Sequence, residues 1–224
     1  LVISSESTLS SEHRLLPTDE PLGSFRALFP RERRHELSIM HIAAGPDESM
    51  PGKFYILTNW KARNFRLMEC PEERTGKTHW TEVVPHRPDV LLEDVEVFRD
   101  HLVITERSNG LVQLRVRQLS TGQERTIDFH DPAYVAYGGV NPEWDTTKFR
   151  FGYSSLTTPD SVYEHDLLTG QDRLLKQQEV VGDFDASRYI SERIWATTRD
   201  GVRIPISLVH RRDLAMDGKA PLLL

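Results

Sequence analysis

Short apolar or alternating runs, each bounded by polar turn residues, dominate the chain, and long helical periodicity is scarce. In one run, Leu114 and Val116 alternate with arginines, which places apolar side chains on one face of a strand and charges on the other. Turn signals such as Asn109-Gly110 separate the runs. The pattern therefore predicts antiparallel strands at residues 54–58, 65–69, 102–105, 111–116, 149–153 and 161–165.

These strand pairs recur at a nearly constant spacing. Thr121-Gly122-Gln123 returns 48 residues later as Thr169-Gly170-Gln171, and strand–turn–strand units begin at residues 54, 102 and 149. Residues 2–16 are a candidate for an earlier, more divergent copy. A period of about 40–50 residues with about four strands per unit is typical of β-propeller blades. We expect three clear blades and one partial blade.

The rhythm changes after residue 183. Residues 189–198 and 202–209 predict two strands around Asp200-Gly201, a hairpin signal, and Pro205 predicts an edge position. The apolar run Pro221-Leu222-Leu223-Leu224 predicts a strand buried on both faces of an α/β sheet. We therefore expect blades in residues 1–185 and the start of a second domain in residues 186–224. Both ends interrupt such patterns, so we expect an internal piece of a longer protein.

The composition argues against some classes of binding partner. A net charge of −6 and a pI near 5.9 argue against a nucleic-acid-binding surface, and the basic run at residues 31–34 is expected to be a solvated turn. No apolar stretch approaches the roughly 18 residues of a membrane span. Cys70 is the only cysteine, which rules out an internal disulfide and fits a reducing compartment. We expect a cytoplasmic protein with neither nucleic-acid nor membrane partners.

Three segments approach catalytic motifs without completing them. The stretch from Gly152 lacks the second glycine of a nucleophile elbow, so its serines are expected at a strand end. His35 begins like a zinc-protease helix, but Ile39 replaces the second histidine, so a satisfied strand histidine is expected. Gly76-Lys77-Thr78 ends like a phosphate loop, but Pro71 stands where the first glycine is needed.

The remaining candidates are also better explained by structure. None of the nine histidines pairs with the cysteine at metal spacing, and Asp183 and Asp185 are expected in a linker turn. Trp60, Trp80 and Trp144 are expected to pack between blades. The residues alone predict a mostly β protein with no catalytic site, no cofactor and no metal.

Four ordered segments resemble a known family: residues 131–135, 149–160, 174–180 and 191–209. Tyr-Ser-Ser-Leu-Thr-Thr-Pro, followed by Arg-Asp-Gly-Val-Arg-Ile-Pro-Ile-Ser-Leu-Val, closely resembles the prolyl oligopeptidase family of serine peptidases, in its oligopeptidase B branch. The resemblance covers essentially the whole chain, more loosely in its earlier part.

The resemblance implies a partial seven-bladed-type propeller of about three to four blades, followed by the first strands of an α/β-hydrolase domain. It implies trypsin-like cleavage of short peptides after Arg or Lys, with the propeller gating access. The implied partners are short basic peptides and the remaining blades and hydrolase domain of the same protein. The family's Ser, Asp and His are expected beyond Leu224, so the chain itself is expected to be inactive.

Two alternatives stay open. One is a non-enzymatic propeller that binds a peptide or protein on its face. The hairpin around Asp200-Gly201 and the apolar run at Pro221 argue against it, because a pure propeller needs no α/β extension. The other keeps the family and changes the specificity to prolyl or acylaminoacyl cleavage.

Overall fold

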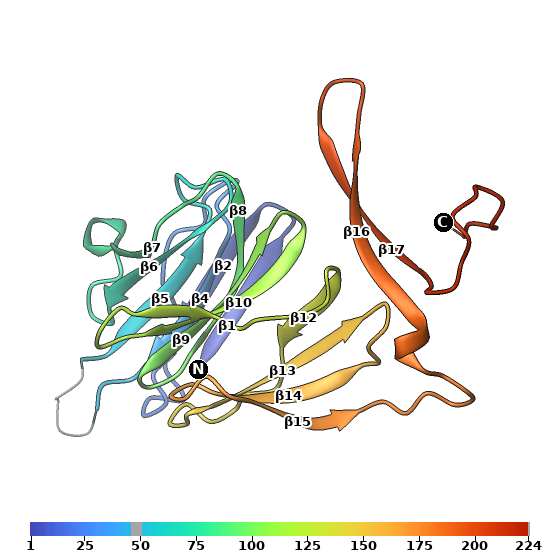
Figure 1. Cartoon of the computed structure of the whole chain (residues 1–224). Coiled ribbons are helices and arrows are strands. Elements are labelled where there is room, and N and C mark those ends of the chain that lie inside the picture. The colour runs from blue at the N-terminus through green and yellow to red at the C-terminus, as the bar shows by residue number, and fades with distance from the viewer. Residues whose placement is uncertain (46–50, 224) are drawn as a thin grey trace. The chain divides into compact units, whose positions relative to one another are not determined.

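The described chain, residues 1–45 and 51–223 of a computed structural model, is built almost entirely from antiparallel strands (Figure 1). It divides into two compact units, Leu1–Asp94 and Val95–Leu224. In every sheet, each strand pairs with the strand that precedes it in the sequence. The sheets are therefore meanders, which need only short connections between neighbouring strands.

Two sheets form in the first unit. The first runs β1 (Val2–Ser7), β2 (Ser10–Leu15) and β3 (Arg26–Ala27). The second runs β4 (Leu37–Ile42), β5 (Lys53–Thr58), β6 (Arg66–Pro71) and β7 (Thr81–Val84), with a short 3₁₀ helix, η1 (Lys77–His79), before β7.

Three more sheets follow. One runs β8 (Val90–Val97), β9 (His101–Ser108), β10 (Leu111–Gln118) and β11 (Glu124–Thr126). The next runs β12 (Tyr134–Gly138), β13 (Lys148–Ser155), β14 (Ser161–Asp166) and β15 (Asp172–Gln177). After the 3₁₀ helix η2 (Ala186–Arg188), β16 (Tyr189–Thr197) and β17 (Arg203–Arg211) form a hairpin.

The predicted strand pairs are confirmed, with β5/β6, β9/β10 and β13/β14 at the expected positions. The three four-stranded sheets correspond to the three clear units of the repeat, and β1–β2 lies in the divergent copy. The strand predicted at residues 221–224 is wrong over residues 221–223, and Leu224 lies outside the described residues. A strand needs a neighbour for its backbone groups, and no described strand pairs with this run.

The core of the second unit lies between the sheets β8–β11 and β12–β15. Apolar side chains from both sheets and their connections form one cluster: Phe98, Val103, Val112, Leu114, Val116, Ile127, Ala136, Phe149, Phe151, Tyr153 and Leu167. The side chains that point away from this cluster on β12 are exposed, with Val135 at 57% and Tyr137 at 54%. One face of the β12–β15 sheet is thus covered by the β8–β11 sheet, and its other face is exposed at β12.

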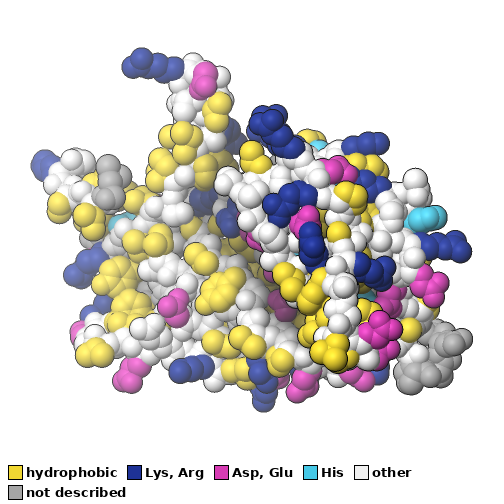
Figure 2. Space-filling model, turned by 180° about the vertical axis from the view of Figure 1, so that it is seen from behind, with side chains coloured by type: hydrophobic (Ala, Val, Ile, Leu, Met, Phe, Trp, Pro, Cys, Tyr) yellow, Lys and Arg dark blue, Asp and Glu magenta, His cyan; other side chains and the backbone are white. Residues whose placement is uncertain are grey.

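The hairpin β16–β17 is exposed on both faces. Its apolar side chains Ile194, Ile204 and Ile206 remain open to solvent, and Figure 2 shows hydrophobic side chains along the surface of this hairpin. Trp195 lies between two arginines, with its ring centroid 5.2 Å from Cζ of Arg193 and 4.5 Å from Cζ of Arg203. Pro205 lies in a two-stranded sheet, which confirms its predicted edge position.

Edge-to-face contacts between aromatic rings pack the core of the first unit. Trp80 packs edge-on against Phe29 at 5.1 Å and against Trp60 at 5.5 Å between ring centroids, which confirms packing roles for both tryptophans. The same expectation is wrong for Trp144, which is 38% exposed in the loop between β12 and β13. Cys70 is buried, and desolvation raises the pKa of its thiol to about 11.

Adjacent leucines provide a matched test of the core in the second unit. Leu167 is 0% exposed in the cluster, whereas Leu168 is 62% exposed. We expect Leu167→Ala to lower the free energy of unfolding by about 2–5 kcal/mol, because the buried side chain leaves a cavity. Leu168→Ala is expected to change it by no more than about 0.5 kcal/mol. Urea denaturation measures both, and equal losses would contradict the assigned core.

Buried histidines predict a pH dependence of stability. Burial is the main cause that lowers the pKa of His35 and of His101. The unfolded histidines titrate near their usual pKa of about 6.5, so the unfolded chain binds these protons first as the pH falls. The free energy of unfolding is therefore expected to decrease from about pH 7 toward pH 5.

Denaturation at a series of pH values measures this slope. Replacing both histidines by glutamine is expected to flatten the dependence in that window, since glutamine does not titrate. A slope that is unchanged in the double variant would assign the effect to other groups.

Candidate functional site

The serines that approach a nucleophile elbow stabilise a turn instead. Ser154 and Ser155 are the last residues of β13, as predicted, and no helix follows. The Ser155 hydroxyl accepts hydrogen bonds from the backbone N–H groups of Thr157 (3.1 Å) and Thr158 (2.9 Å), and its own backbone N–H donates to the Thr158 carbonyl. These bonds fix the turn at residues 156–160 between β13 and β14.

Asp131 ties this turn to the connection between β11 and β12. The Tyr153 hydroxyl donates to Asp131 Oδ2 at 2.5 Å, and the Thr158 hydroxyl donates to the same oxygen at 3.1 Å. Burial, reinforced by the bond to Asp131, raises the pKa of Tyr153, so the phenol stays a neutral donor. Two segments that carry the family resemblance, residues 131–135 and 149–160, therefore meet at one carboxylate.

A groove of about 430 Å³ lies under this connection. Phe129 stacks on Tyr153 with centroids 5.2 Å apart, and the carboxylates of Asp128, Asp131 and Asp172 reach the same space. No Lys or Arg is among the described residues that line it. Aromatic faces and carboxylates both attract cations, so the groove suits a positively charged side chain.

The hairpin β16–β17 contacts the turn between β9 and β10. The Arg193 guanidinium donates to the backbone carbonyl of Asn109. Gly110 has a φ of +80°, and a Cβ there would lie 3.0 Å from Arg193 Nη2 and 3.5 Å from Pro205 Cγ. The Asn-Gly pair therefore allows both the tight turn and the close approach of the hairpin. Its turn role was predicted, but its contact with the hairpin had no local signal.

In the segment between β15 and η2, Asp183 and Asp185 form local contacts as expected for a turn, while its role as a domain linker stays a prediction. Asp185 Oδ1 accepts from the backbone N–H of Ser187 at 2.9 Å, and Arg188 pairs with Asp183 at 3.0 Å. The hydrogen bonds from Ser187 lower the pKa of Asp185. A cavity of about 490 Å³ lies between this segment and residues 157–159 of the turn after β13.

The other motif-like segments have structural roles. Lys77 lies in η1 and pairs with Glu32 at 2.7 Å, so the segment that resembles a phosphate loop holds an ion pair. His35 lies two residues before β4, and its Nε2 lies 2.9 Å from the Thr58 hydroxyl, so it is satisfied, although outside the strand. In the basic run, Arg31 donates to Ser5 at 2.9 Å in an exposed turn.

Two pairs of neighbouring side chains each contain two of the three residue types of a catalytic triad. Ser4 Oγ lies 2.9 Å from Nδ1 of the cross-strand His13, whose Nε2 lies 2.9 Å from the Leu37 carbonyl rather than from a carboxylate. His165 Nδ1 lies 2.6 Å from Asp172 Oδ1, but its other nitrogen faces an arginine and no serine. Neither pair builds the Ser–His–acid arrangement. Sequence reasoning missed both, since each requires the strand register.

Within residues 1–45 and 51–223, no group of three or more His, Cys, Asp or Glu side chains is placed to hold a metal ion. No helix in that part of the chain is long and apolar enough to cross a membrane.

Known proteins align with most of this chain. Residues 1–178 match the family described as the N-terminal β-propeller domain of prolyl oligopeptidase. Dipeptidyl aminopeptidase BI of Pseudoxanthomonas mexicana is 41% identical over 225 aligned residues, which cover 100% of this chain and 30% of that protein. Protease 2 of Moraxella lacunata is 30% identical over 225 aligned residues, which cover 100% of this chain and 31% of that protein.

A solved structure shares the fold. Oligopeptidase B of Trypanosoma brucei superimposes with a TM-score of 0.82 at 27% identity, over 96% of this chain and 31% of that one. The chain thus spans about 30% of the length of these relatives. The match confirms the expected propeller fold, whereas the domain boundary near residues 183–188 stays a prediction. The chain belongs to the prolyl oligopeptidase family, whose N-terminal β-propeller domain it matches over residues 1–178.

Proposed function

We propose that the intact protein is a serine peptidase that hydrolyses short peptides by acyl transfer. The observation that carries this proposal is the family match over residues 1–178. A Ser nucleophile, activated by His and oriented by Asp, would lie beyond Leu224. The chain supplies propeller blades that restrict access to that site, and residues 186–224 begin the α/β-hydrolase domain.

Contacts at one end of the β12–β15 sheet, where the chain leaves this sheet, support the gating role. The turn at residues 156–160 is held by Asp131, and it borders the segment that leads to the hairpin. The Arg193 contact joins the hairpin to a second turn, at Asn109. These hydrogen bonds make the loops rigid where they border the proposed peptidase domain. Rigid loops at the entrance favour short, flexible substrates.

We further propose cleavage after Arg or Lys. The resemblance to oligopeptidase B supports this specificity, and so does the likeness to the T. brucei structure. The acidic and aromatic groove beside Asp131 adds a local negative field that favours cationic peptides. We also propose that the protein acts in the cytoplasm, without a cofactor and without nucleic-acid or membrane partners.

A second candidate is removal of dipeptides from a free N-terminus. One observation favours it, because the relative at 41% identity is named a dipeptidyl aminopeptidase. The two activities share the acyl-transfer chemistry and differ in whether the substrate's free amine is recognised. Purely prolyl specificity and a non-enzymatic propeller remain the alternatives to be tested beside it.

A substrate panel distinguishes these activities in the full-length protein. We expect cleavage after Arg or Lys in a blocked peptide, with little cleavage after Pro, Leu or Glu. Cleavage only of unblocked dipeptidyl substrates would establish the second candidate, and an inert full-length protein would support the binding propeller. The 224-residue chain alone is expected to be inactive, and turnover by the chain free of contaminating protease would contradict the proposed position of the triad.

Asp131 allows a test of the gate. Asp131→Ala leaves the Tyr153 and Thr158 hydroxyls without their shared acceptor, so the turn at residues 156–160 is expected to loosen. In the full-length enzyme we expect kcat/KM to rise for long unstructured peptides relative to a short one. Asp128→Ala is the control, because no hydrogen bond or ion pair of that carboxylate forms among the described residues.

The measurement is the ratio of kcat/KM for long and short peptides carrying the same cleavage sequence. A ratio that stays constant in Asp131→Ala, with only the melting temperature lowered, would leave the turn a structural role and contradict its role in gating.

A further inference from the structure

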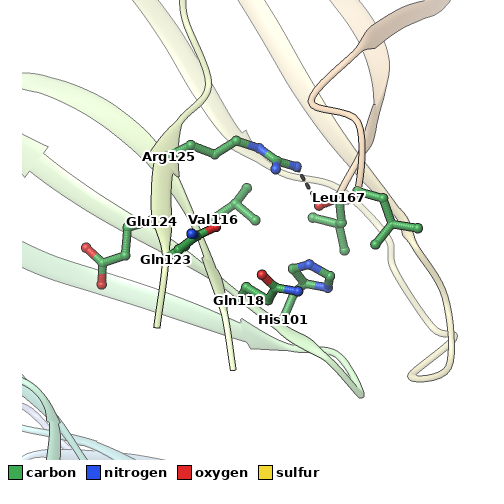
Figure 3. A pocket seen from close by; sticks show the side chains of 8 residues that line it. His101, Val116, Gln118, Gln123, Glu124, Arg125 and Leu167 are labelled. Atoms are coloured by element: carbon green, nitrogen blue, oxygen red, sulfur yellow. Dashed lines mark hydrogen bonds between the residues drawn. The ribbon is translucent and has the colours of Figure 1, made fainter. Parts of the chain in front are cut away.

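A third, smaller cavity lies between the two repeated turns. It measures about 230 Å³ and lies where residues 119–123, between β10 and β11, approach residues 167–171, between β14 and β15. Figure 3 shows its lining side chains, with Arg125 on one side and His101 on the other. Val116 and Leu167 supply apolar walls.

Arg125 brings hydrogen-bond donors to this cavity. Its Nη2 donates to the backbone carbonyls of Leu167 at 2.5 Å and Asp166 at 3.1 Å and lies 3.5 Å from His165 Nε2, whereas its buried Nε has no partner. No carboxylate pairs with this guanidinium in the described part of the chain. Glu124 also lines the cavity, but its carboxylate pairs with Arg115 at 2.5 Å and is directed away from Arg125 in Figure 3. Asp166 pairs with Lys148 at 2.5 Å.

His101 faces the same space from β9. The residue is 3% exposed, its ring lies opposite the Arg125 guanidinium in Figure 3, and the ring nitrogens form no hydrogen bond with the described residues, whereas the backbone carbonyl accepts from Phe98. Burial lowers the pKa of this imidazole, and the smaller effects of the Asp100 carboxylate, which raises it, and of Arg125, which lowers it, act in opposite directions. The ring is therefore neutral near pH 7, with one N–H to donate.

We propose that this cavity binds a carboxylate group, held between the Arg125 guanidinium and the His101 imidazole. The planar guanidinium matches the two oxygens of a carboxylate, and the apolar walls strengthen a charge-assisted hydrogen bond by excluding water. An amine or a metal cation would meet an unpaired positive charge instead. The carboxylate belongs either to the free C-terminus of a peptide or to a small organic acid.

The sequence repeat provides a matched control. Arg173 occupies the position equivalent to Arg125 in the repeated segment, eight residues into residues 166–173 as Arg125 is in residues 118–125. Arg173 instead pairs with Glu164 at 2.8 Å and lies 71% exposed. Arg125, in contrast, reaches the Leu167 and Asp166 carbonyls of the following sheet.

The test is an NMR titration of the 224-residue chain, observing the His101 ring nitrogens and Arg125 Nε. N-acetylglycine represents a peptide C-terminus, N-acetylglycinamide lacks the carboxylate, and acetate represents a small acid. We expect saturable shifts with N-acetylglycine and none with the amide. Weaker binding of acetate would indicate a peptide terminus, and equal binding a small acid. Absence of saturable shifts with both acids, or equal shifts with the amide, would overturn the proposal.

Variants assign the effect to the guanidinium. Arg125→Gln is expected to weaken N-acetylglycine binding by about tenfold or more, the loss expected for a charge-assisted hydrogen bond, whereas Arg173→Gln retains it. If Arg125→Gln does not fold, Arg125→Lys keeps the charge without the planar fork and is expected to weaken binding as well. Unchanged affinity in a folded Arg125 variant would contradict the site.

Discussion

The apolar contact between successive sheets is the interaction on which the second unit depends. Leu114 and Phe149 come from different sheets, are fully buried and belong to one cluster. A four-stranded meander has two faces, and only a neighbouring sheet can cover them. The exposed Val135 and Tyr137 on the far side of the last sheet illustrate what happens without a neighbour. Stability here is therefore shared between sheets, and no single blade contains its own core.

This packing also determines where polar junctions can form. Asp131, in the connection after β11, reaches Tyr153 because this connection leads into β12, which pairs directly with β13. Arg125 of β11 reaches the carbonyls of Asp166, the last residue of β14, and of Leu167 because the two sheets pack against each other. One junction fixes a turn beside the segment leading to the hairpin, whereas the other leaves donors around a cavity. Members of the apolar cluster also supply polar groups to both sites, since the Tyr153 hydroxyl donates to Asp131 and the Leu167 carbonyl accepts from Arg125.

Local patterns predicted the sheets well because alternation and turn residues act over a few positions. The repeat around Gly122 and Gly170 located the blades, and Asp200-Gly201 located the hairpin. Contacts between distant segments had no such signal, as the Ser4–His13 pair illustrates. Trp144 and the run at residues 221–223 were misjudged because burial and pairing depend on neighbours that hydrophobicity alone does not specify. The family resemblance, rather than periodicity, supplied the expected chemistry.

Arg125 and Arg173 show how a repeat acquires different functions at equivalent positions. Both follow a Thr-Gly-Gln turn and an acidic residue, so local sequence treats them alike. Arg173 forms an exposed ion pair on its own sheet, whereas Arg125 reaches carbonyls of the next sheet and keeps a buried donor unpaired. Equivalent residues therefore gain different contacts at the junctions between repeats, where one sheet supplies the charged side chain and the next sheet supplies its carbonyl and apolar neighbours. The same reasoning applies to Asn109, an ordinary turn residue whose carbonyl gains a role only when Arg193 of the hairpin approaches it.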